Sequence, residues 1–304
     1  MDIVIGIDLG GTNVKAIALD KSGNSLYQCS YPTNDGDKDW KAAILETVCD
    51  IRSKIQCRKD VIGISAPGLP NRDNSAIAFM PGRLRGLENF VWSDFLGTTT
   101  FVLNDAISAM MAEARFGAAK GRKNVVMITL GTGVGGAILI DGKPYQGSFK
   151  KAGHIGHITV DSQGNRDIIG IPGSLEDAIG NCTIEKRSYG KYTSTQQLVD
   201  DYRKGDSFAA EVWLTSVKKL AIGIASLTNV LSPEMVVIGG GITSAGSDLF
   251  EPLEQYMNFY EWRTFGDKTE IVKAQFEEMA GAIGVACFAM EQVTLMDAIG
   301  EIRV

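Results

Sequence analysis

Cysteine is scarce in this chain of 304 residues: there are five, an odd number, and none belongs to a C-x-x-C pair. This pattern argues against a disulfide framework and predicts reduced thiols in a cytoplasmic protein. Long hydrophobic runs are also missing, since none approaches the roughly 20 residues that a membrane-spanning helix needs. The N-terminus shows neither the basic region nor the cleavage site of a signal peptide. We therefore expect no membrane partner.

An excess of positive charge is lacking as well. The chain has 30 lysines and arginines against 36 aspartates and glutamates, and the basic residues are scattered along it. Binding to a nucleic-acid backbone usually needs a concentrated basic face. The charge balance therefore argues against nucleic acid as a partner.

Glycine, by contrast, is abundant, with 35 residues, and some of these glycines stand in a repeat. Residues Ile5–Asp20 and Val126–Asp141 each read as an apolar strand, a glycine-rich turn, a second apolar strand and a polar turn. The repeat indicates two similar halves that each aim glycine backbone at one cleft. Because glycines let backbone N–H groups approach a ligand closely, phosphate is the first ligand to consider.

The rest of the chain alternates helices and strands. Apolar residues at helical spacing predict helices at 39–56, 106–116, 174–187, 194–204, 207–231, 247–258 and 279–293. Buried strands are expected at 60–65, 100–103, 235–238 and 269–276. Two three-stranded meanders followed by helix-linked strands predict an α/β protein, with mixed sheets and helices packed on them.

The second glycine turn matches a dinucleotide fingerprint in its letters alone. Gly131, Gly133 and Gly136 satisfy G-x-G-x-x-G, but the fingerprint requires a helix after the loop, and a strand is expected here. No glycine turn is followed by the G-K-[ST] of a Walker loop. What remains is an anion-binding hairpin, with Asp8 before the first turn facing the anion through a cation such as Mg²⁺. The alternative is two tight hairpins with an ordinary Asp, and the repeat favours the anion site.

Two further strand ends carry candidate residues. Gly239–Gly241 follows an apolar strand and would suit a flat ligand such as an adenosine, although such turns are common in α/β folds. Asn104 and Asp105 stand where a strand ends and a helix begins. An N-cap is the commonest role there, and the alternative is that Asp105 is a general base for phosphoryl transfer.

The chain has only two histidines, His154 and His157, which lie three residues apart among glycines. The glycines argue against a metal site on a helix, and no third ligand is near in sequence. A polar pocket is therefore the favoured interpretation. Glu176 opens a helix, where a carboxylate is commonly a capping or surface residue.

In this order the motifs resemble the ROK family of sugar kinases and repressors, within the actin-like ATPase superfamily. The resemblance spans nearly the whole chain and rests on Asp8–Thr12, Ala66–Gly68, Asn104–Ala106, Gly131–Gly136, Gly156–His157, Gly173–Glu176 and Val237–Ile242. It implies two actin-like (ribonuclease H-like) domains, with ATP and a sugar in the cleft between them. The expected domains are 1–108 with 291–304, and 109–290. The resemblance also implies a homodimer.

The resemblance further implies a role for each matching residue. Asp105 would take the proton of the sugar hydroxyl that attacks the γ-phosphate of ATP, and Asp8 would face Mg²⁺. Besides Asp105, the sugar would contact Gly68, Asn104, His154, His157 and Glu176. The nucleotide would contact Asp8, Gly10, Gly11, Thr12, Lys15, Gly131, Thr132, Gly133, Gly240 and Gly241.

Two function classes follow from the resemblance. Repressor members carry a helix-turn-helix domain ahead of the first glycine motif, whereas this sequence starts at its first expected strand. We therefore expect an ATP-dependent kinase acting on a hydroxyl, most simply the 6-hydroxyl, of a hexose or N-acetylhexosamine similar to glucose or N-acetylmannosamine. The alternative is a non-catalytic sugar-binding regulator, but a pure sensor needs neither Asp105 nor three nucleotide turns.

The zinc motif of the family is missing from this sequence. Asp167, Ile169 and Ser174 stand where the family has cysteines that bind zinc together with the histidine of the Gly-His pair. Zinc needs close to four good nitrogen or sulfur donors. We therefore expect no zinc, and a loop held by packing instead.

Two other departures bear on the sugar. Glucokinase-like members have Glu at the position of His154, and the arrangement here is similar to that of bacterial N-acetylmannosamine kinases. This tilts the expectation from glucose toward an N-acetylated hexose. Arg83 and Arg85 follow a Pro-Gly pair that replaces the family's usual Pro-Asn. They could meet an acidic or extended sugar, although a solvent-facing position is the more common one.

Overall fold

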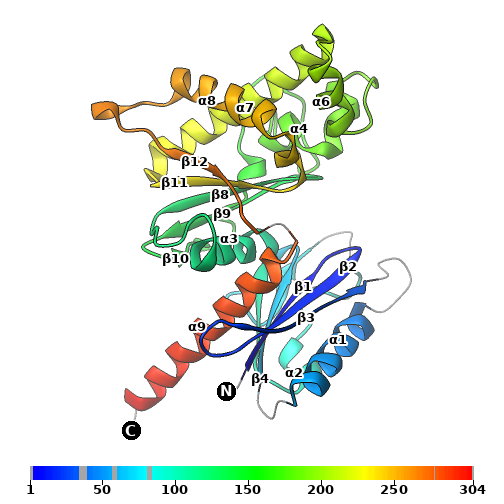
Figure 1. Cartoon of the computed structure of the whole chain (residues 1–304), viewed down its shortest axis with the longest axis vertical. Helices are drawn as coiled ribbons and strands as arrows, with labels where there is room; N and C mark the ends of the chain where they lie inside the picture. The colour runs from blue at the N-terminus through cyan, green and yellow to red at the C-terminus, as the bar shows by residue number, and fades with distance from the viewer. Residues whose placement is uncertain (1–2, 34–39, 57–59, 81–83, 277, 303–304) are drawn as a thin grey trace. The chain divides into compact units, whose positions relative to one another are not determined.

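The computed structural model shows two compact units, each with its own hydrophobic core (Figure 1). The residues that the structure describes are 3–33, 40–56, 60–80, 84–276 and 278–302. Unit 1 comprises residues 1–121, 146–151 and 276–304, and unit 2 comprises residues 122–145 and 152–275.

Unit 1 is built on a five-stranded mixed sheet in the order β3-β2-β1-β4-β7. Its strands are β1 (Ile3–Leu9), β2 (Asn13–Leu19), β3 (Ser25–Pro32), β4 (Asp60–Ala66) and β7 (Thr100–Asn104). β1, β2 and β3 form an antiparallel meander, whereas β4 runs parallel to β1 and β7 runs parallel to β4. The parallel strands end at one edge of the sheet, which brings Asp8, Ser65 and Asn104 to that edge.

Helices pack against this sheet. They are α1 (Trp40–Ile55), α2 (Trp92–Leu96), α3 (Asp105–Phe116) and α9 (Ala280–Ile302), and a small hairpin is formed by β5 (Leu69–Pro70) and β6 (Ile77–Phe79). α9 packs on β1, β4 and α3. Glycine permits this close approach, since a Cβ on Gly6 would overlap the carbonyl of Ala282, and a Cβ on Gly284 would overlap the carbonyl of Ser108.

The sheet of unit 2 repeats the same plan, in the order β10-β9-β8-β11-β12. Its strands are β8 (Val125–Leu130), β9 (Val134–Ile140), β10 (Lys143–Pro144), β11 (Met235–Gly239) and β12 (Glu270–Lys273). β8, β9 and β10 are antiparallel, β11 is parallel to β8, and β12 is parallel to β11. The glycine repeat of the sequence is therefore a repeat of topology.

Helices and short 3-10 turns surround the second sheet. The helices are α4 (Leu175–Ile179), α5 (Ile184–Arg187), α6 (Thr195–Arg203), α7 (Ser207–Leu231) and α8 (Ser247–Tyr260). The 3-10 turns are η1 (Ile155–His157), η2 (Asn181–Thr183), η3 (Gly241–Ala245) and η4 (Thr264–Gly266). α7 begins at the N-cap Asp206, whose carboxylate accepts from the Ala209 N–H, and its Trp213 is fully buried in the core.

The predicted α/β fold with two mixed sheets and flanking helices is confirmed. The single helix expected at 174–187 is instead α4, η2 and α5, because Gly180 adopts extended backbone (φ −58°, ψ 144°) and interrupts it. The last helix runs on to Ile302 rather than ending at 293. The boundaries of the compact units are not those of the expected domains, since 109–121, 146–151 and 276–290 belong to unit 1, where α3 packs on α9.

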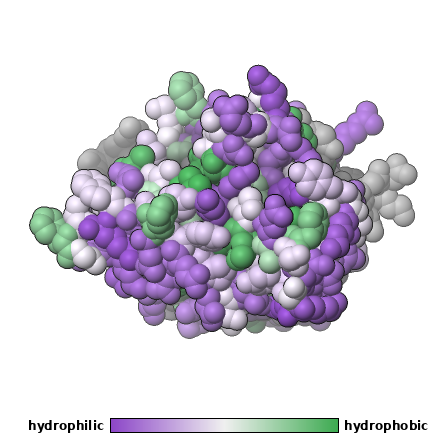
Figure 2. Space-filling model, turned by 90° about the horizontal axis from the view of Figure 1, so that it is seen from above, coloured by the Kyte–Doolittle hydropathy of each residue, from purple (hydrophilic) through white to green (hydrophobic). Residues whose placement is uncertain are grey.

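The face seen in Figure 2 carries hydrophobic side chains singly or in small groups among hydrophilic ones. Exposed aromatic residues include Phe259, Trp262 and Phe265. Single exposed hydrophobic side chains are common on globular proteins. Among the described residues, no helix combines the length and the hydropathy that crossing a membrane would require.

Candidate functional site

Asp8 is the penultimate residue of β1 in unit 1, and its carboxylate faces two neighbours. The Ser65 hydroxyl donates to Asp8 Oδ1 at 2.6 Å, and a Cβ on Gly281, in the first turn of α9, would touch the Asp8 carboxylate. Burial raises the pKa of Asp8 to about 6; the Ser65 hydrogen bond opposes this rise, and the charge of Asp105 adds to it. The like charges of Asp8 and Asp105 therefore interact in unit 1. This arrangement favours the binding of a divalent cation.

Asn104 and Asp105 stand at the junction between β7 and α3. Asn104 Oδ1 accepts from the Ala106 N–H at 3.0 Å, so the expected N-cap exists, and Asn104 Nδ2 donates to the Gly68 carbonyl at 3.0 Å. Asp105 is exposed and its Oδ1 also accepts from the Ala106 N–H, at 2.8 Å. The structure thus brings the predicted sugar residues Gly68, Asn104 and Asp105 together, with the Asn104 amide bonded to backbone.

The first glycine turn, Gly10–Thr12, is tied down by its own backbone and by Thr33. The Gly10 N–H donates to the Asn13 carbonyl, and the Thr33 hydroxyl donates to the Gly10 carbonyl at 2.6 Å. Lys15 pairs with Asp8 across the β1–β2 ladder, and its ammonium lies 3.4 Å from the Glu278 carboxylate. Asp8, Gly10, Gly11, Thr12 and Lys15, all predicted for nucleotide or Mg²⁺, therefore share one hairpin.

The second turn is held by Glu176. The Gly131 N–H donates to the Gly133 carbonyl, and Glu176 Oε2 accepts from the Val134 N–H at 3.0 Å. A Cβ on Gly133 would overlap Glu176 Oε2, so glycine is required where the carboxylate crosses the turn. Glu176, predicted as a sugar ligand, therefore also supports the turn predicted to meet the nucleotide.

The third turn places Gly240 and Gly241 beside β8, the strand that precedes the second turn. Gly240 has φ +90°, and a Cβ there would overlap the backbone of Leu130 at the end of β8. A Cβ on Gly241 would meet nothing within 4 Å. The first glycine is needed for packing against β8, whereas the second opens η3 next to free space.

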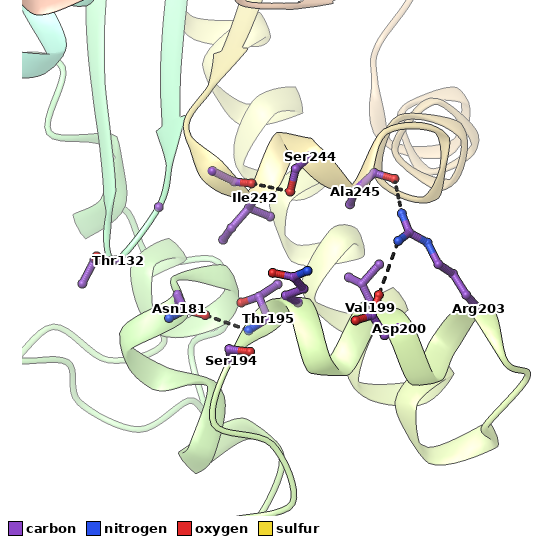
Figure 3. Close-up of a pocket in the computed structure, with 13 residues that line it drawn as sticks. Thr132, Asn181, Ser194, Thr195, Val199, Asp200, Arg203, Ile242, Ser244 and Ala245 are labelled. Atoms are coloured by element: carbon purple, nitrogen blue, oxygen red, sulfur yellow. Dashed lines mark hydrogen bonds and ion pairs between the residues drawn. The ribbon is translucent and has the colours of Figure 1, made fainter. Parts of the chain in front are cut away.

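A cavity of about 430 Å³ in unit 2 is lined by the second and third turns together with α6 (Figure 3). Gly131, Thr132 and Gly241, all predicted for the nucleotide, belong to its lining. Lining residues that the sequence reasoning missed include Asn181, Thr195, Asp200, Arg203 and Ser244. They come from η2, α6 and η3, and no local motif marks them.

Hydrogen bonds fix the wall of this cavity. Asn181 Oδ1 accepts from the Thr195 N–H at 2.7 Å, and Arg203 reaches the Ala245 carbonyl at 3.2 Å and the Asp200 carboxylate at 3.5 Å (Figure 3). The Thr195 hydroxyl is buried and has no hydrogen-bond partner within the described part of the chain. An unpartnered hydroxyl at a cavity wall is suited to a polar ligand atom.

The Gly-His segment lies against the start of β9. A Cβ on Gly156 would overlap the Val134 carbonyl, and the Leu175 N–H donates to the Ile158 carbonyl at 2.9 Å. His157 and Glu176 are thereby brought to the same strand start, since Glu176 bonds to the Val134 N–H. His154, the N-cap residue of η1, is half-buried.

Asp167 organises the loop at 161–173, where the resemblance led us to look for a zinc motif. The buried Asp167 carboxylate lies 3.2 Å from His157 Nδ1 and accepts from the N–H groups of Ile169 and Ile171. Hydrogen bonds, and not packing alone, hold this loop, while Ile169 is exposed. Among the described residues, no group of three or more His, Cys, Asp or Glu is arranged to hold a metal ion.

The two arginines proposed from sequence cannot both be placed. Arg83 lies outside the described residues. Arg85 is exposed, and its carbonyl accepts from the Trp40 indole N–H at 3.1 Å.

The comparison with known families decides where these motifs belong. Residues 4–292 match the model of the ROK family. The chain belongs to the ROK family. A glucokinase of Thermotoga maritima is 31% identical over 314 residues, which cover 95% of this chain and 98% of that protein. The N-acetylglucosamine repressor of Escherichia coli is 28% identical over 97% of this chain and 76% of its own length.

A solved ROK structure confirms the family's architecture. The ROK hexokinase of Thermus thermophilus superposes with a TM-score of 0.83 at 26% identity, over 96% of this chain and 99% of that one. This ROK chain therefore has the two actin-like domains that its motifs imply.

Proposed function

We propose that this ROK protein is an ATP-dependent sugar kinase that transfers the γ-phosphate of ATP to the 6-hydroxyl of a hexose or N-acetylhexosamine. The observation that carries the proposal is the co-location of three predicted nucleotide residues, Gly131, Thr132 and Gly241, on one cavity. The 31% identity with a glucokinase over nearly its full length supports the same reaction. The protein would act as a cytoplasmic homodimer with no nucleic-acid or membrane partner.

In the proposed reaction Asp105 is the general base. Its carboxylate, at the first position of α3 and exposed, accepts the proton of the sugar hydroxyl. The sugar oxygen forms a bond to the γ-phosphorus while the bond from phosphorus to the β–γ bridging oxygen breaks, leaving ADP. Asn104 and Gly68 hold the base's position, since the Asn104 amide joins the α3 N-terminus to the Gly68 carbonyl.

Asp8 would face Mg²⁺ bound with ATP. The fit rests on the donor chemistry, because the half-buried carboxylate has a raised pKa beside a second carboxylate, Asp105, and Mg²⁺ prefers oxygen ligands. When bound, Mg²⁺ would neutralise charge on the phosphates. The hydrogen bond from the Ser65 hydroxyl orients the Asp8 carboxylate at the sheet edge.

The acceptor is proposed to be an N-acetylated hexose rather than glucose. A neutral His154 offers one donor and one acceptor, where a glucokinase-like Glu would offer only acceptors. His154 stands beside the 3-10 turn that carries His157. Phosphorylation of glucose and N-acetylmannosamine by wild type and by His154→Glu, compared side by side, tests this choice. An unchanged preference would contradict it.

The reaction itself is tested by ADP release over a sugar panel. Wild type should turn over at least one hexose or N-acetylhexosamine, and Asp105→Asn should lower kcat by about 10²–10⁴ while sparing sugar binding. Asp94→Asn, a change in the first turn of α2, is a matched control and should keep full activity. No turnover of any sugar, or full activity in Asp105→Asn, would refute the proposal.

A non-catalytic regulator is the second candidate, favoured by one comparison, the N-acetylglucosamine repressor. It predicts sugar-dependent thermal stabilisation without release of ADP. The two candidates separate in a single experiment, since only a kinase loses activity in Asp105→Asn.

A further inference from the structure

The loop at 161–173 holds a buried charged group, the Asp167 carboxylate. This carboxylate contacts His157, a predicted sugar residue. Its side chain is 1% exposed, against 28% for His157. Oδ1 accepts from the N–H groups of Ile169 at 3.0 Å and Ile171 at 2.9 Å, and Oδ2 lies 3.2 Å from His157 Nδ1. Both backbone contacts of this group therefore come from donors, and the role of His157 Nδ1 depends on its tautomer.

This contact set defines the protonation of both partners. Burial opposes ionisation, but the Ile171 N–H, the Ser174 hydroxyl and His157 together hold the pKa of Asp167 below its usual value. An ionised carboxylate only accepts hydrogen bonds, so His157 Nδ1 must carry a proton and donate. When the imidazole is neutral, its Nε2 is then an acceptor.

The backbone fixes where that ring stands. His157 ends η1, and its neighbour Gly156 abuts the Val134 carbonyl. The Val134 N–H is bonded to Glu176. Asp167 thus holds the His157 ring from one side. The segment that carries the ring is anchored at the start of β9, which Glu176 also contacts.

We propose that Asp167 is a positioning residue, which locks His157 in the Nδ1–H tautomer so that Nε2 accepts a hydrogen bond from a hydroxyl of the sugar. The proposal rests on the proposed function for the identity of the ligand. A buried carboxylate here does by hydrogen bonding what a bound cation would do at the same nitrogen: it fixes the orientation of the ring and the nitrogen that faces the ligand. The sugar hydroxyl that meets His157 must therefore be a donor.

The kinetic test compares Asp167→Asn with a matched control in the same loop. Asp161→Asn removes a carboxylate that bonds Lys219 and the Gln163 N–H but does not touch His157. Asp167→Asn should raise the KM for the sugar by about 10-fold and leave the KM for ATP within about 2-fold. Asp161→Asn should leave both constants within about 2-fold of wild type.

A double-mutant cycle separates positioning from a general structural role. In a His157→Asn background, Asp167→Asn should cause no further rise in the KM for the sugar, because the residue through which it acts is gone. The same fold-increase in both backgrounds, or an unchanged KM in Asp167→Asn alone, would overturn the proposal.

A measurement without substrate keeps this inference distinct from the kinase proposal. Because the chain has only two histidines, the imidazole ¹⁵N spectrum of the whole protein can be assigned with His154→Gln and His157→Gln. His157 should show a protonated Nδ1 and an unprotonated Nε2 in wild type and lose this pattern in Asp167→Asn. An unprotonated Nδ1 in wild type would overturn the Asp167 assignment even if a sugar is phosphorylated. Absence of turnover with the expected spectrum would instead overturn the kinase proposal alone.

Discussion

The two sheets share one strand order, but their first hairpins differ in what stands before the turn. In unit 1 the penultimate residue of β1 is Asp8, paired in register with Ser65 of β4. In unit 2 the equivalent position of β8 is Thr129, paired with Gly239 of β11. The same topology therefore presents a carboxylate and a hydroxyl in one unit, and a hydroxyl and bare backbone in the other.

The turns differ as well. The ladder pair that flanks the first turn is Leu9–Val14, which encloses residues 10–13, whereas the pair that flanks the second turn is Leu130–Val134, which encloses 131–133. Each turn is closed by a hydrogen bond of its own backbone, and each also contacts a side chain from elsewhere in its unit: Thr33 in the first turn and Glu176 in the second. We therefore predict that the hairpin with Asp8 serves a cation, and that the other hairpin serves close contact between backbone and ligand.

The largest effect is expected from replacing Asp8, the charged residue before the first turn. Asp8→Asn should lower kcat by at least about 10²-fold, because the neutral amide no longer balances the charge of Mg²⁺. Activity with saturating sugar and ATP over a series of Mg²⁺ concentrations measures this. Thr129→Val, at the equivalent position of the other hairpin, should stay within about 5-fold of wild type. Equal losses in the two variants would contradict the division of roles.

Without ligands, the same substitution should stabilise the protein. Burial raises the pKa of Asp8 from an ordinary 3.8 to about 6 in the folded protein, so the folded state binds more protons than the unfolded state between these values. The contribution of Asp8 to stability should therefore fall as the pH rises from about 4 to 6. The stability of Asp8→Asn relative to wild type should rise over the same range, to a gain of about 1–2 kcal/mol above pH 6. Thermal unfolding without Mg²⁺ from pH 4 to 8 measures it. A gain that is greatest at pH 4 would contradict the raised pKa.

A pair of glycine substitutions sharpens the backbone side of the comparison. Gly240→Ala should destabilise the protein by about 2–4 kcal/mol, because Gly240 has φ +90° and its Cβ would overlap Leu130. Gly241→Ala should stay within about 0.5 kcal/mol, since nothing lies near its Cβ. Urea unfolding of both variants provides the measurement. Similar midpoints for the two would show that the third turn tolerates side chains throughout.

Local sequence patterns were sufficient to predict the hairpins and the fold. The glycine repeat and the apolar strands identified both meanders, because strand periodicity and turn chemistry are local. The break at Gly180 was missed, since glycine alone does not distinguish a tolerated helix residue from an interruption. The family was confirmed, while the roles of Asp105, His154 and the other site residues stay predictions.

The parts of the site that escaped prediction depend on contacts distant in sequence. Asp167 was expected only as a missing zinc ligand, and its bonds to His157 and Ile171 arise from the closure of a loop. Arg203 of α6 donates to the Ala245 carbonyl of η3 and so joins these two parts of the cavity wall. Neither contact has a periodic or motif signature, because each joins side chains of ordinary surface type to backbone elsewhere.

The smallest effect is expected from a substitution of Thr195 in the wall of the unit 2 cavity. Thr195→Val should raise the KM for ATP by about 3–10-fold, because the buried hydroxyl that finds no partner among the described residues would lose its bond to a polar atom of the nucleotide. Stability should hardly change, since valine has nearly the same shape. Asp206→Ala, outside the lining of this cavity, removes instead the cap of α7 that accepts from the Ala209 N–H, and should cost about 1 kcal/mol of stability while the KM for ATP stays constant. Initial-rate kinetics and thermal unfolding on the two variants test the contrast. A loss of stability in Thr195→Val with no change in KM would assign its hydroxyl to the fold and remove it from the nucleotide site.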